Sequence, residues 1–68
     1  MREWLVIYYD DCAEAVDTDL LHMDEQDVLL EAFFRLESYP TIVKVIVYTT
    51  KEDGDTDLPF AVINKVVP

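Results

Sequence analysis

An uninterrupted run of six apolar and aromatic residues, Trp4 to Tyr9, constrains the fold of this 68-residue chain more than any other feature. These residue types favour strands, and the run is far too short to span a membrane. Successive side chains of a strand point to opposite faces, so both faces of this strand are apolar. Strands of this kind are usually covered on both sides. We therefore expect a strand over Glu3–Tyr9 that needs apolar cover on each face.

A second constraint is a helix whose apolar side is unusually wide. Asp24 is the expected N-cap, where its carboxylate would satisfy free amides, and Pro40 ends the helix near Ser38. At about 100° per residue, the apolar side chains between these ends sweep an arc of roughly 240°. A helix lying on one small sheet needs a much narrower stripe. The sheet therefore cannot cover the whole apolar arc, and the side chains we expect it to leave uncovered are Leu30 and Phe34.

The C-terminal half predicts two further strands joined by a tight turn. Thr41–Thr50 and Leu58–Val67 are rich in β-branched residues, and Asp53-Gly54 between them is a strong hairpin signal. A two-residue turn there fixes the pairing of the two strands. The expected pairs are Tyr48 with Pro59, Val47 with Phe60, Ile46 with Ala61, Val45 with Val62, Lys44 with Ile63 and Val43 with Asn64.

Together these elements predict an α+β fold of order β-α-β-β in a single domain over 1–68. One main helix would pack on a three-stranded mixed sheet, and the β-α-β crossover should be right-handed. Residues 11–17 could add a short extra helix, because Cys12, Ala13 and Ala15 tolerate helical geometry. The sequence leaves the strand order open.

One helix covers only one face of such a sheet. The other face, if left bare, would be a larger apolar patch than soluble monomers normally expose. We expect a homodimer to cover it, either sheet to sheet or through the helix flank, unless residues 11–23 fold under the open face. The side chains expected at this contact are Leu30, Phe34, Ile42, Ile46, Tyr48 and Ile63, with Ala61 on the same sheet face.

Charge is divided very unevenly along the chain. Residues 3–34 contain ten carboxylates and no Lys or Arg, and their charge of -10 equals that of the whole chain. Such a body repels nucleic acid and anionic lipid, and it attracts basic surfaces. Mixed charge would keep a protein soluble without this self-repulsion. We therefore interpret the acidity as serving a basic partner.

The remaining composition indicates the class of protein. A hydrophobic content of 51% is too high for a disordered acidic tail. The single Cys12 cannot form an internal disulfide, which fits a reducing compartment, and residues 1–9 lack the pattern of a signal peptide. We expect a complete, small, cytoplasmic protein.

One pattern raises the possibility of an enzyme. Asp10 and Asp11 follow an apolar strand directly, where α/β folds often place metal-dependent phosphoryl chemistry. Over five residues, 6–10, the chain is also similar to the first strand of the small CRISPR-associated nucleases. The chain is too short for the ferredoxin-like fold of that family, and no basic residue stands nearby to bind phosphate. We therefore carry no activity over, and solvated acids that end a strand are the favoured interpretation.

Two other patterns are weaker. Cys12 and His22 could form a nucleophile and base, but no third group is placed to orient them. The alternating acids of 53–57 begin like a calcium loop, yet the glycine and the last ligand of that motif are misplaced. The sequence therefore predicts no enzyme, no catalytic residue, no cofactor and no metal.

The leading functional hypothesis is an acidic inhibitor that occupies the basic groove of a nucleic-acid-binding protein by mimicking phosphate charge. In size, acidity and lack of a catalytic set the chain resembles the DNA-mimicking inhibitors of phages and mobile elements, such as anti-CRISPR and anti-restriction proteins. The alternative is an assembly or antitoxin-like regulatory module that binds through the apolar helix flank or a sheet edge. The residues expected to contact the basic partner are Asp10, Asp11, Glu14, Asp17, Asp19, Asp24, Glu25 and Asp27.

Overall fold

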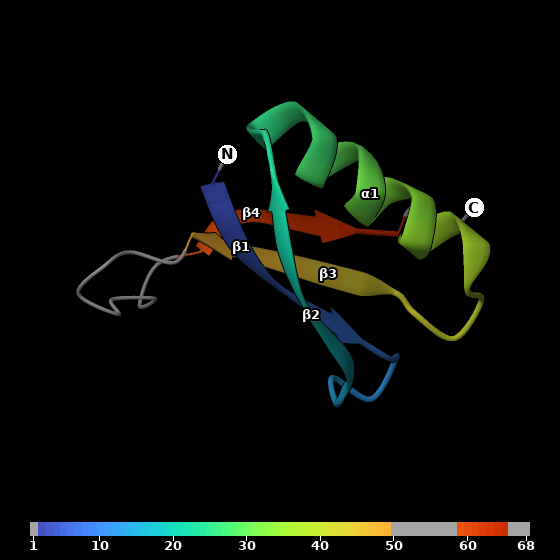
Figure 1. Ribbon diagram of the computed structural model, residues 1–68. Coiled ribbons are helices and arrows are strands. Elements are labelled where there is room, and N and C mark those ends of the chain that lie inside the picture. The colour runs from blue at the N-terminus through green and yellow to red at the C-terminus, as the bar shows by residue number, and fades with distance from the viewer. Residues whose placement is uncertain (1, 50–58, 66–68) are drawn as a thin grey trace.

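The computed structural model describes residues 2–49 and 59–65. It is an α+β fold in which one helix packs on a four-stranded antiparallel sheet (Figure 1). The sheet has the order β2-β1-β3-β4. The elements are β1 Arg2–Tyr9, β2 Ala15–Met23, α1 Glu25–Ser38, β3 Lys44–Thr49 and β4 Pro59–Asn64.

The prediction of a short helix at 11–17 was wrong, because this segment turns and then becomes the edge strand β2. Along β2, Leu21 and Met23 pack against the core, and the Trp4 indole Nε1–H donates to the Met23 carbonyl oxygen at 2.9 Å. Pairing with β1 supplies backbone hydrogen bonds over eight residue pairs. Those long-range bonds outweigh the weak helical preference of Ala13 and Ala15.

The extra strand also corrects the predicted mixed sheet. Since β2 and β3 both run antiparallel to β1, they run in the same direction as each other. Helix α1 joins them and must cross over β1, which lies between them in the sheet. The expected crossover from the first strand to the strand after the helix therefore does not exist, and its place is taken by the link from β2 to β3.

The core forms where α1 crosses the sheet. Helix α1 presents Val28, Ala32 and Leu36 to the sheet, where the central side chains are no more than 1% exposed. The partly buried side chains that surround them are Leu21, Met23, Ala61 and Ile63. The wide arc of the helix leaves Leu30 and Phe34 exposed, as the sequence predicts. The buried sheet residues of this core are Trp4, Val6 and Tyr8 of β1 and Val45 and Val47 of β3.

The pairing of β3 with β4 differs from the prediction by one residue along most of its length. Tyr48 pairs with Pro59 as expected, but an irregularity between Val47 and Tyr48 shifts every other pair. Val47 then pairs with Ala61 and Val45 with Ile63. A shift of one residue moves side chains to the opposite face, because the side-chain repeat of a strand is two residues. The expected turn at 53–54 lies outside the described residues.

The shift changes which residues lie on the face away from the helix. Ala61 and Ile63 pack against the core, so their expected placement on the open face was wrong. Ile42 was also misplaced, since it is buried in the core just before β3. The face away from α1 instead carries residues that alternate with the core positions: Leu5, Ile7 and Tyr9 of β1, Leu20 of β2, Ile46 and Tyr48 of β3, and Val62 of β4.

A matched pair of leucines tests the packing of the helix. Leu36→Ala should lower the free energy of unfolding by about 2–4 kcal/mol, because Leu36 is 3% exposed and its loss leaves a cavity. Leu30→Ala removes the same atoms from a side chain that is 67% exposed, and should change stability by less than about 0.5 kcal/mol. Urea unfolding followed by circular dichroism measures both. Equal effects would contradict the observed orientation of the helix.

Candidate functional site

The eight carboxylates expected to contact a partner lie along one border of the molecule, which we call the acidic edge. The two ends of this row do not meet, because β2 is extended and has its ends far apart. Its nine residues span roughly 26 Å at about 3.3 Å per residue. The edge consists of the loop 10–14, the edge strand β2 and the start of α1 (Figure 1). Its carboxylates are, in chain order, Asp10, Asp11, Glu14, Asp17, Asp19, Asp24, Glu25 and Asp27.

The loop end of the acidic edge is held by Asp10. Its Oδ1 accepts the backbone amides of Cys12 at 2.9 Å and Glu14 at 3.0 Å. Ala13 completes the turn with a φ of 61°, a left-handed conformation that is uncommon for a residue other than glycine. The turn explains why an aspartate directly follows β1. It presents Asp11 and Glu14 to solvent at fixed positions.

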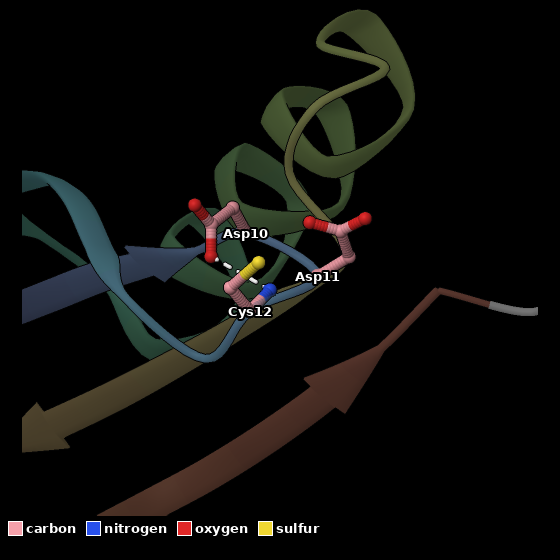
Figure 2. Close-up of side chains that lie close together, drawn as sticks. All are labelled: Asp10, Asp11 and Cys12. Carbon is pink, nitrogen blue, oxygen red and sulfur yellow. Dashed lines mark hydrogen bonds between the residues drawn. The ribbon is translucent and has the colours of Figure 1, made fainter.

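Asp10, Asp11 and Cys12 could each offer a ligand atom within 4.8 Å of the others (Figure 2). Two backbone amides already bind one oxygen of Asp10, so a folding role accounts for this group. The negative charge of Asp11 is the main cause of a raised pKa of the Cys12 thiol. The raised pKa makes this thiol less reactive than a free cysteine, and we assign no metal to the cluster.

The middle of the acidic edge contains one neutralising contact that the sequence did not reveal. Arg35 of α1 pairs with Glu31 at 3.1 Å, as their i,i+4 spacing predicts. The same guanidinium lies 3.8 Å from Oδ2 of Asp19 on β2. Asp19 and Arg35 are distant in sequence, and only the crossing of the helix over the sheet brings them together. Asp19 is thus partly compensated, whereas Asp17 remains exposed.

Tyr8 lies beneath this middle section. Burial raises the pKa of its hydroxyl to about 12, and the negative charge of Asp19 adds to the rise. The hydroxyl oxygen is closed off from solvent, and it makes no hydrogen bond of standard geometry. Beside it is a hollow of about 160 Å³ whose wall also includes Asp17, Arg35, Tyr39 and Ile42.

The helix end of the acidic edge carries three acids around the first turn of α1. Asp24 takes the N-cap position, as predicted, but its side chain makes no capping hydrogen bond. Its carboxylate therefore stays available. Glu25 and Asp27 complement the partial positive charge of the helix N-terminus. Arg2 stands near this group, with its guanidinium 5.5 Å from the centre of the Trp4 ring, and it lines a hollow with Asp24 and Glu25.

His22 does not meet Cys12. His22 is near the end of β2, where its Nε2 lies 2.9 Å from Oε2 of Glu3 on β1. Cys12 belongs to the loop before β2, at the opposite end of the strand. The possible nucleophile–base pair is therefore ruled out by the length of β2.

Comparisons with known proteins identify no relative. No family model, curated protein or solved structure matches the chain. The helix within residues 2–49 and 59–65 is neither long nor apolar enough to cross a bilayer.

The thiol of Cys12 reports on the geometry of the loop. Asp11→Asn removes the main cause of the raised pKa, so the thiol should react faster with iodoacetamide near neutral pH. Asp27→Asn makes the same chemical change in the first turn of α1, beyond the opposite end of β2, and should leave the rate unchanged. Alkylation followed by mass spectrometry measures both rates. Equal rates in the two variants would contradict the proximity of Asp11 and Cys12.

The buried hydroxyl of Tyr8 predicts a pH dependence of stability. Folding raises the pKa of this hydroxyl from 10.0 to about 12. The hydroxyl therefore contributes fully to the free energy of unfolding below pH 10.0, and this contribution is lost as the pH rises from 10.0 to about 12. In Tyr8→Phe the free energy of unfolding should therefore fall less than in the parent between pH about 9 and about 11. Urea unfolding at both pH values measures the difference. Tyr39→Phe, at an exposed tyrosine, is the control, and an unchanged slope in Tyr8→Phe would contradict the prediction.

Proposed function

We propose that the protein is an acidic inhibitor that binds the basic nucleic-acid-binding groove of another protein. The observation that supports this most is the extended row of carboxylates along β2 and its two flanking segments. A DNA strand carries a phosphate about every 3.4 Å along the helix axis, so roughly 26 Å corresponds to about eight phosphates. The edge strand β2 has about this length and contains Asp17 and Asp19, and three further carboxylates lie in the segment at each of its ends.

The carboxylates differ in how freely they could meet a partner. Asp19 has Arg35 as a neighbour, and Asp10 uses one oxygen in the turn. The other members of the acidic edge are exposed. We therefore expect most of the binding energy to come from Asp11, Glu14, Asp17, Asp24, Glu25 and Asp27.

A basic side chain of the partner has a suitable place in the middle of the edge. The hollow beside Tyr8 combines the carboxylate of Asp17 with the half-exposed ring of Tyr39. Arg35 also lines it, but its positive charge is already paired with Asp19 and Glu31. An acid next to an aromatic face is a combination that binds Lys and Arg side chains well. We propose this hollow as the point where a partner Lys or Arg inserts, which would fix the register of an otherwise diffuse charge attraction.

The proposal is tested by charge reversal and by competition. The triple variant Asp11→Lys, Glu14→Lys, Asp17→Lys should abolish capture of the partner from a host lysate, because it reverses the exposed charge over half of the edge. Glu37→Lys makes the same change per residue near the C-terminus of α1 and should capture normally. Raising salt from about 50 to 200 mM should weaken capture roughly tenfold or more.

The captured protein should be a nucleic-acid-binding protein, and excess double-stranded DNA should release it from the immobilised chain. Mass spectrometry of the captured material and gel-shift competition measure these outcomes. Capture that survives high salt and excess DNA would overturn the proposal.

A second candidate function is supported by a different observation. Leu30 and Phe34 are 67% and 63% exposed on the outer side of α1, one turn apart. An assembly or antitoxin-like module could use this apolar ridge, or a sheet edge, to bind its partner. In that case Phe34→Glu would abolish capture, and the triple charge reversal would be tolerated.

A further inference from the structure

The sheet face turned away from α1 is the second large surface of the protein, and the acidic edge does not use it. At its centre lie Leu5 and Ile7 of β1 and Ile46 and Tyr48 of β3, which are partly exposed. Leu20 of β2 is 60% exposed and Val62 of β4 is 48% exposed. Helix α1 packs on the opposite face (Figure 1). We call this surface the open face.

Most carboxylates of the described strands avoid the open face, and the base Lys44 lies on it, with its Nζ 5.8 Å from the centre of the Tyr9 ring. Asp17 and Asp19 pair with Tyr8 and Val6, so they lie on the helix side of β2. The one carboxylate that the strand register places on the open face is Glu3, and it meets His22 at 2.9 Å. A basic partner would therefore find almost nothing to pair with there. In a protein of charge -10, this is the surface on which two copies can approach with the least repulsion.

We propose that a second copy of the chain covers the open face, so that the protein is a homodimer whose two sheets pack face to face. An isologous contact of this kind places the same apolar patch on both sides, and packed sheets lie about 10 Å apart. Copies oriented with their β2 strands at opposite borders would keep the two acidic edges apart. Both edges then stay accessible to basic partners.

The size of the face sets the expected strength of the dimer. Four strands about 4.8 Å apart, over about six residues of 3.3 Å each, give a projected area of roughly 400 Å² per copy. Side chains make the accessible area of each face larger than its projected area. Two such faces therefore approach the roughly 1,000 Å² of buried area that a specific interface needs. This is the lower end of the range, so we expect dissociation in the micromolar range and dimers at higher concentration.

The competing apolar surface is the ridge formed by Leu30 and Phe34 on α1. It consists of single side chains on the curved outside of a helix, and it offers less continuous area than the open face. Glu31 and Glu37 flank it on the same helix, so two ridges in contact would bring like charges together. On the open face the strand register places one carboxylate, Glu3, beside His22, and one base, Lys44, so two such faces in contact do not bring rows of like charge together, and we assign the dimer to the sheet.

Sedimentation equilibrium over a range of protein concentrations tests the proposal. The parent should reach twice the 7.9 kDa mass of the chain at the upper concentrations. Ile46→Lys at the centre of the open face, and Leu20→Lys at its border, should stay monomeric with the circular dichroism spectrum of the parent. Leu30→Lys is the matched control on the helix ridge and should still dimerise. Leu20 is exposed, so its variant remains informative if Ile46→Lys fails to fold.

The response to salt separates this contact from the proposed inhibitor function. Added salt should strengthen the dimer, because it screens repulsion between two acidic bodies, whereas it should weaken capture of a basic partner. The charge-reversed triple variant should keep the dimer. A parent that is monomeric at every concentration overturns the proposal. Loss of the dimer in Leu30→Lys but not in Ile46→Lys also overturns it, and assigns the contact to the helix.

Discussion

The structure depends on the burial of one face of β1 beneath α1. Trp4, Val6 and Tyr8 lose nearly all contact with water, and they do so against a helix that must cross over their own strand. The crossing fixes β2 and β3 on the two sides of β1, and it brings Arg35 to Asp19. The same burial leaves the alternate residues of β1 on a face that the helix cannot reach. Both large surfaces of the protein therefore follow from how one apolar strand is covered.

We propose that the acidic edge and the open face serve two different kinds of interaction. Carboxylates repel one another and are best placed on loops, on the border strand and at the helix N-terminus, where water and the helix dipole stabilise them. Apolar side chains gather where neighbouring strands pack them together. Separating the carboxylates from the apolar side chains keeps like charges out of an apolar contact and leaves the carboxylates of the acidic edge accessible to a partner. The proposed inhibitor and the proposed dimer use different residues for this reason.

Local sequence signals predicted the parts of the fold that depend on local physics. The strand ending at Tyr9 and the helix from Asp24 to Ser38 were confirmed, because β preference, an acidic first turn and a proline just after the helix all act within a few residues. The prediction that the sheet leaves Leu30 and Phe34 uncovered was confirmed too, since the width of an apolar arc follows from helical periodicity alone. The signals for 11–23 were weak and mixed, and there the prediction failed.

The failed predictions depend on distant residues. Residues 15–23 form a strand because they make backbone hydrogen bonds with β1. No pattern within the segment itself indicates this pairing. The irregularity between Val47 and Tyr48 shifted the pairing of β4 by one residue, which moved Ala61 and Ile63 into the core. The candidate site shows the same limit. The sequence identified the eight acids, but their arrangement as a row followed only from the extension of β2.

By itself, the sequence determined that the protein has a strand that is apolar on both faces, a helix with a wide apolar arc, and negative charge concentrated in residues 3–34. Those properties come from composition and from periodicities of two and 3.6 residues. Only the tertiary structure decided that β1 lies inside the sheet, that the acids form an edge, and which apolar residues remain on the open face. Strand order and register come from hydrogen bonds between residues far apart in the chain, and these are chosen by how the whole core packs.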